Sequence, residues 1–263
     1  MIIFTLNQSS TPVKTVAPVG PNIILIFMDD MGYGDLSCYG ALDLNTPNID
    51  RLASEGIRFT NFLSAQAVCS ASRAAILTGC YPNRVGISGA LFPASAIGLA
   101  KEEMTIADLL KQKKYATGIF GKWHLGDSPE FLPLNQGFDE YLGIPYSNDM
   151  WPVNFDGQPA KPGTNKYRFP PLPLIRNSAP VDTISTLEDQ AMLTSKLTDE
   201  AISFIRRNKK RSFFAYIPHP MPHVPINASA AFRSKSKQGL YGDMIQEVDH
   251  NVGRIMDALK KEG

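Results

Sequence analysis

The stretch NIILIFMDD, residues 22–30, decides the predicted fold. Residues 22–28 form a continuous apolar run rich in β-branched side chains, which is typical of a strand buried on both faces of a sheet. Two carboxylates, Asp29 and Asp30, follow this run at once. In open α/β sheets ligands gather at the carboxyl ends of the strands, so the stretch indicates a strand that leads into a site.

Two further apolar runs, residues 116–120 and 212–217, are predicted as buried strands, and polar side chains follow each. Periodicity and capping signals predict helices at 46–56, 73–78, 105–113, 187–207 and 240–261, the first with Thr46 as its cap, Pro47 at its first position and Gly56 as its stop. Residues 145–185 are rich in Pro, Asn and Gly and are predicted as a long excursion without helix or strand. Alternating strands and helices predict an α/β fold whose central sheet is mostly parallel and flanked by helices.

Composition narrows the class of protein. The 263 residues carry a formal net charge of +1, which gives no indication of nucleic acid or of an anionic membrane as a partner. No apolar run reaches the roughly 20 residues that span a bilayer. Residues 1–20 are interpreted as a loose leader, and 21–263 as one catalytic region. The three cysteines, Cys38, Cys69 and Cys80, are too few for a disulfide framework and are not spaced as a zinc site.

Asp29 and Asp30 allow two interpretations. Adjacent carboxylates are common in solvated turns, where they need no ligand. They also repel each other unless a cation or a proton intervenes, and oxygen ligands suit Ca²⁺ or Mg²⁺. The sequence therefore makes the pair a candidate site for a hard cation.

A second stretch, CSASRAAILTG at residues 69–79, places Cys69 at the mouth of a predicted helix beside Ser70, Ser72 and Arg73. A helix N-terminus favours anions and lowers a thiol pKa, so Cys69 is a candidate nucleophile. A cysteine in such a place is also often a packed, inert thiol. Lys122 and His124 stand two residues apart in GKWHLG, so on an extended segment they are expected to face the same way.

The string C-x-A-S-R-x-x-x-L-T-G resembles the signature of type I sulfatases, in which the cysteine is oxidised to formylglycine; the commoner form of the signature has proline where this chain has Ala71. Five other segments resemble sulfatase segments in the same order: PNIILIFMDDMGYGDLSCYG, TPNIDRLASEGIRFTNF, TGIFGKWHLG, LNQGFDEYLGIPYS and HPMPHVP. The resemblance covers residues 21–263 nearly continuously. It is closest to the branch of arylsulfatase A and N-acetylgalactosamine-6-sulfatase.

The resemblance implies an alkaline-phosphatase-like fold, hydrolysis of sulfate monoesters, and one calcium ion held by Asp29, Asp30 and the modified Cys69. A hydroxyl of the hydrated aldehyde at Cys69 attacks sulfur, and the second hydroxyl later expels sulfate. A plain serine or cysteine lacks that second hydroxyl, which is the chemical reason for altering the cysteine.

The resemblance also assigns roles to the surrounding side chains. Arg73 pairs with the formylglycine oxygens, and Lys122 binds sulfate. His124 moves a proton as the aldehyde is restored. Ser147 lies near the sulfate, and His223 contacts sulfate and protonates the leaving oxygen. The resemblance assigns His219 no direct contact with the substrate.

The same resemblance sets further expectations. An Asp-Asn pair that completes the calcium shell, and a later sulfate-binding lysine, are not found, so residues 21–263 are interpreted as the N-terminal half of a sulfatase and the chain alone is expected to turn over little substrate. Expected partners are a sulfate ester or a sulfated saccharide and a formylglycine-generating enzyme, in the periplasm or outside the cell. Within residues 145–185, Asn148, Asp149 and Trp151 are candidate sugar contacts or loop packing. The alternatives are a non-catalytic remnant and a phosphatase or phosphodiesterase of the same superfamily.

Overall fold

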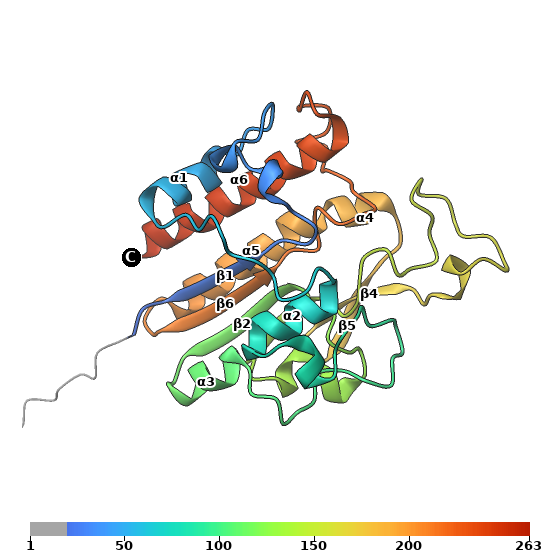
Figure 1. The fold of residues 1–263 in the computed structure, drawn as a ribbon, viewed down its shortest axis with the longest axis horizontal. Helices are drawn as coiled ribbons and strands as arrows, with labels where there is room; N and C mark the ends of the chain where they lie inside the picture. Colours follow the sequence, from blue (N-terminus) through green and yellow to red (C-terminus); the bar gives the residue numbers. More distant parts are fainter. Residues whose placement is uncertain (1–19) are drawn as a thin grey trace, which may run out of the picture.

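The computed structural model describes residues 20–263, so the predicted leader lies outside the described residues except for Gly20. Its core is a six-stranded sheet with the order β1-β6-β2-β3-β4-β5 (Figure 1). The pairs β1/β6, β6/β2 and β2/β3 are parallel, whereas β3/β4 and β4/β5 are antiparallel. The predicted α/β fold with a mostly parallel sheet is confirmed. The strands are β1 Ile23–Phe27, β2 Ala116–Lys122, β3 Glu140–Ile144, β4 Leu172–Arg176, β5 Ala179–Ile184 and β6 Phe213–Pro218.

Helices cover both faces of the sheet (Figure 1). On one face α5 packs against β2 and β6 and α6 packs against α5, with α1 outside α6; α2 and α3 lie on the other face. Each face has its own apolar cluster, and β2 and β6 are buried throughout. The prediction that the first strand is buried on both faces was wrong: β1 is only half-buried, because it is an outer strand of the described sheet. None of the helices among residues 20–263 is long and apolar enough to cross a bilayer. The helices are α1 Pro47–Glu55, α2 Cys69–Thr78, α3 Ile106–Gln112, α4 Leu187–Ala191, α5 Leu193–Asn208 and α6 Gly239–Glu262.

The prediction for residues 145–185 was wrong in its second half. β4 and β5 form an antiparallel hairpin there, and β3 just before this region was not predicted. Pro173 lies outside the part of β4 that pairs with β3, and Pro180 lies in the outermost strand. Proline is tolerated at such positions because no inner ladder needs its missing N–H group. The predicted helix at 187–207 is also divided, into α4 and α5, at Met192.

The start of α1 differs from the prediction in its chemistry. Thr46 stands at the N-cap position, but its side chain accepts no bond from the helix backbone and instead contacts Ser37 and Asp50. The buried carboxylate of Asp249 on α6 accepts the backbone N–H groups of Asn48 and Ile49, at 3.0 and 2.8 Å. A carboxylate from a neighbouring helix therefore caps α1 and ties it to α6.

Because β1, β6 and β2 are parallel neighbours, their carboxyl ends meet at one edge of the sheet. Asp29 follows β1, Lys122 ends β2, and His219 follows β6. The sequence-based expectation that these three strand ends converge is confirmed, and this edge carries the candidate site.

Candidate active site

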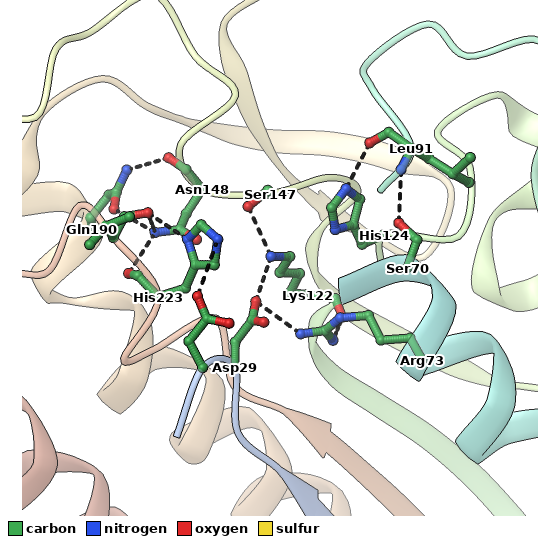
Figure 2. Close-up of polar contacts among 12 residues, drawn as sticks. Asp29, Ser70, Arg73, Leu91, Lys122, His124, Ser147, Asn148, Gln190 and His223 are labelled. Atoms are coloured by element: carbon green, nitrogen blue, oxygen red, sulfur yellow. Dashed lines mark hydrogen bonds and ion pairs between the residues drawn. The ribbon is translucent and has the colours of Figure 1, made fainter. Parts of the chain in front are cut away.

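Four polar side chains meet in the protein interior at this edge (Figure 2). Lys122 Nζ donates to Asp29 Oδ2 at 2.5 Å and to Ser147 Oγ at 2.9 Å. Arg73 Nη2 lies 3.2 Å from Asp29 Oδ2, and Arg73 Nη1 donates to the Lys122 carbonyl oxygen at 2.6 Å. The side chains of Lys122 and Arg73 are 0% exposed. The structure thus places two cations around one carboxylate, with a hydroxyl bonded to one of the cations.

Asp29 is ionised in this cluster. Burial by itself would raise the pKa of its carboxyl, but the charges of Arg73 and Lys122 outweigh burial and hold that pKa well below its usual range. Two buried cations share the single buried carboxylate of Asp29, so the interior of the cluster carries excess positive charge, while Asp30 lies at its solvent-facing edge with a side chain that is 63% exposed. The cluster is suited to an anionic ligand.

Cys69 is the first residue of α2, so the helix begins at the cysteine and not after it. Cys69 lines one cavity together with Asp29, Asp30 and Ser72. The predicted lowering of its thiol pKa is wrong: burial raises the pKa of Cys69, and the opposing charges of Lys122 and Arg73 do not compensate. The unmodified side chain is therefore a protonated thiol, and Cys38, Cys69 and Cys80 are all free of disulfides.

His124 lies beside Lys122, but its backbone is left-handed with φ 58°, so the extended segment expected across these two residues ends before the histidine. Its Nε2 donates to the Leu91 carbonyl oxygen at 2.7 Å, while the Leu91 N–H donates to Ser70 Oγ on α2 at 3.0 Å. Burial, with the charges of Lys122 and Arg73, holds the pKa of His124 well below its usual value. Its Nδ1 has no partner among the described residues and keeps a free lone pair.

His223 approaches the site from the loop after β6 (Figure 2). Its Nδ1 donates to the Val224 carbonyl oxygen at 2.6 Å, and its Nε2 lies 3.6 Å from Asp30 Oδ2. His219 is fully buried, burial lowers its pKa to about 4, and neither ring nitrogen has a partner within residues 20–263. His223 therefore faces Asp30, whereas the His219 ring forms no hydrogen bond with the described site residues.

The side chains of Asn148 and Trp151 are both 0% exposed, so they do not contact a sugar at the surface, contrary to one of the sequence-based interpretations. Asn148 instead bonds to Gln190 on α4 and to the loop that carries His223. Gln190 was not found from the sequence, because a glutamine inside a helix carries no signal of a partner 42 residues away.

The site contains some of the ligands that a metal ion would need. Asp29 and Asp30 supply the hard oxygen ligands that calcium prefers and line the same cavity as Cys69. Within residues 20–263, no three His, Cys, Asp or Glu side chains lie close enough together to hold an ion by themselves. The two carboxylates fit a hard cation that takes its remaining ligands from other groups.

Known proteins that are similar in sequence match nearly the whole of the described chain. The sequence model of the sulfatase family matches residues 21–263. Human arylsulfatase A is 42% identical over 250 residues, covering 91% of this chain and 48% of that protein. Human N-acetylgalactosamine-6-sulfatase is 39% identical over 259 residues, covering 93% of this chain and 47% of that protein. This chain thus spans about half the length of the curated relatives it matches.

A solved structure with the same fold is that of Ps i-CgsB, with a TM-score of 0.76 at 35% identity, covering 92% of this chain and 55% of that one. Ps i-CgsB has also been solved in complex with k-i-k-neocarrahexaose. The match to the family over nearly the whole chain, together with the identity to two named sulfatases, decides the assignment: the chain belongs to the sulfatase family.

Proposed function

We propose that this chain carries the catalytic centre of a sulfuric ester hydrolase, and that residues 21–263 are the N-terminal part of its catalytic domain. The observation that carries the proposal is the buried cluster in which Lys122 and Arg73 share Asp29 beside Ser147. Excess positive charge away from water is what stabilises a transferring anionic group. The cavity shared by Cys69, Asp29 and Asp30 supports the same interpretation.

The sulfate group is held by the cluster. Lys122 Nζ and Ser147 Oγ, 2.9 Å apart, donate to its oxygens, and the Arg73 guanidinium keeps its charge throughout. Asp29 holds Lys122 in place before the substrate arrives, so little reorganisation is needed. In hydrated form, a formylglycine made from Cys69 would supply the oxygen nucleophile that attacks sulfur.

Two histidines move protons. The free lone pair of His124 Nδ1 accepts a proton, because the Leu91 carbonyl fixes the hydrogen on Nε2. The Val224 carbonyl keeps one hydrogen on His223 Nδ1, so Nε2 gives a proton to the leaving oxygen when the ring carries a second proton. Asp29 and Asp30, with the modified Cys69, would hold calcium, which supplies positive charge to the sulfate oxygens.

We propose a sulfated saccharide as the substrate class. The support is the neocarrahexaose complex of Ps i-CgsB and the name of N-acetylgalactosamine-6-sulfatase, both relatives of this chain. A formylglycine-generating enzyme is the partner that the modification of Cys69 requires.

The test is co-expression of the chain with a formylglycine-generating enzyme, followed by single-turnover assays with enzyme in excess over 4-nitrophenyl sulfate and over 4-nitrophenyl phosphate. We expect sulfate release that needs calcium, disappears with excess chelator, and is absent from Cys69→Ala. Faster cleavage of the phosphate ester would instead support a phosphatase. Lack of either reaction in a chain whose Cys69 is modified would support a non-catalytic remnant.

A further inference from the structure

Two buried amide side chains, Asn148 and Gln190, lie between the Ser147 segment and the loop that carries His223 (Figure 2). Asn148 Nδ2 lies 3.2 Å from Gln190 Oε1, 3.3 Å from the His223 carbonyl oxygen and 3.3 Å from the Val224 carbonyl oxygen. Gln190 Nε2 donates to the Asn148 carbonyl oxygen at 2.7 Å. The two side chains therefore connect three separate segments.

The orientation of the Asn148 amide is fixed by its surroundings. Three carbonyl-type oxygens surround Nδ2, so a flipped amide would place oxygen against oxygen. Asn148 Oδ1 is buried without a partner among the described residues. Burying an unpartnered oxygen costs about 1–3 kcal/mol, so the side chain keeps its orientation for the bonds that Nδ2 makes.

Gln190 is itself held firmly. It lies on α4, whose first turn is closed by a capping box: Asp189 N–H donates to Thr186 Oγ1 at 3.1 Å, and Thr186 N–H donates to Asp189 Oδ2 at 2.9 Å. Asn227, on the same loop as His223, donates from Nδ2 to the Leu187 carbonyl oxygen of α4 at 2.8 Å. Helix α4 thus anchors the loop directly through Leu187 and indirectly through Gln190 and Asn148.

The His223 loop depends on such anchors, because residues 219–238 contain neither helix nor strand. Asn148 follows Ser147 directly, and Ser147 bonds to Lys122 Nζ. Through Asn148, the His223 backbone is tied to the segment that holds the sulfate-binding lysine. This link sets the separation between the proton donor and the anion site.

We propose that Asn148 and Gln190 are positioning residues that hold His223 where its Nε2 reaches the leaving oxygen of the ester. The proposal rests on the proposed function for the role of His223, but the link itself stands on the bonds above. Neither amide touches substrate, since both are 0% exposed. Their effect is on the geometry of proton transfer.

The kinetic test is Gln190→Leu, with Gln136→Leu as the matched control. Gln136 is also buried and also donates to a backbone carbonyl, that of Leu99 at 2.8 Å. Each variant is assayed with 4-nitrophenyl sulfate, whose leaving group needs little protonation, and with a sugar 6-sulfate, whose alkoxide leaving group needs it. Since a general acid contributes about 10²–10⁴-fold, we expect Gln190→Leu to lower kcat for the sugar ester at least about 10-fold more than for the aryl ester.

A second readout does not need activity. The chain has four histidines, so their imidazole signals can be assigned by NMR. We expect Gln190→Leu, and Gln190→Met, which keeps the length of the side chain but loses its bonds to Asn148, to shift or broaden the His223 signals, and Gln136→Leu to leave them in place. If the parent chain releases no sulfate even in the single-turnover assay, the proposed function fails, and the NMR measurement still tests whether Gln190 holds His223. Unmoved His223 signals in both Gln190 variants, or equal losses with the two esters, would overturn the proposal.

Discussion

Replacing Lys122 by methionine tests whether the buried cluster binds sulfate. Methionine keeps the length and the apolar stem of lysine but removes the charge that lies 2.5 Å from Asp29 and 2.9 Å from Ser147. Arg73 remains 3.2 Å from Asp29, so the carboxylate keeps one cation. The substitution therefore removes the ligand for the anion without leaving Asp29 alone.

The size of the effect follows from Coulomb's law. Two unit charges about 4 Å apart interact by about 4 kcal/mol at an effective dielectric constant of about 20. Asp29 already offsets part of the charge of Lys122, so we expect a loss of about 2–3 kcal/mol, or about 30- to 150-fold in kcat/KM. Leaving a buried charge entirely unpaired costs about 3–5 kcal/mol, and because Arg73 stays, we expect about 1–2 kcal/mol of lost stability.

The assay compares Lys122→Met with Lys196→Met, measuring kcat/KM for 4-nitrophenyl sulfate, affinity for inorganic sulfate by calorimetry, and urea unfolding. Lys196 forms a surface ion pair with Asp182 at 2.9 Å, and its side chain is 46% exposed. Such pairs contribute at most about 1 kcal/mol, so the control is expected to change little. Unchanged sulfate affinity in Lys122→Met would refute the role of the cluster as an anion site.

Three other predictions concern His124, His219 and Asp249. His124→Gln is expected to lower kcat about 10²–10⁴-fold while sulfate affinity stays unchanged; a fall in affinity alone would contradict proton transfer by His124. Burial lowers the pKa of His219 from 6.5 to about 4, so between these pH values the unfolded chain binds a proton that the folded chain rejects. Stability is expected to fall by about 3 kcal/mol as pH drops through this window, and His219→Leu, followed by urea unfolding, is expected to remove this part of the slope. Asp249→Ala removes the carboxylate that caps α1 and is expected to cost about 2–3 kcal/mol, with hydrogen exchange faster in α1 than in α5; equal exchange in both would refute the cap.

The strands that position the site were predictable because most of their side chains are apolar. The runs at β1, β2 and β6 are mostly apolar, with Thr117 and the terminal Lys122 of β2 as exceptions, since helices cover both faces of the sheet. Polar residues at or shortly after the ends of such runs stand out, which is why Asp29, Lys122 and His223 were singled out as candidates, whereas the roles of Lys122 and His223 came from the resemblance to the family. The outer strand β5 lacks this contrast: it is mostly exposed and contains Pro180, so its pattern looks like a loop.

Residues that act across long sequence separations were not predictable. Asp249 caps a helix about 200 positions away, and Gln190 bonds to Asn148 through an arrangement that only the folded chain creates. The thiol pKa of Cys69 was predicted in the wrong direction because burial, which a local pattern does not reveal, outweighs the neighbouring charges. Local signals identify the side chains, whereas tertiary packing decides their partners and their protonation.

The measurement that tests the central claim most directly is the mass of the tryptic peptide 59–73, which contains Cys69, after co-expression with a formylglycine-generating enzyme. The proposed chemistry predicts a peptide about 18 Da lighter than the cysteine form, because an aldehyde replaces the thiol. An unmodified thiol at Cys69, in a host where a known sulfatase is fully converted, would contradict the account.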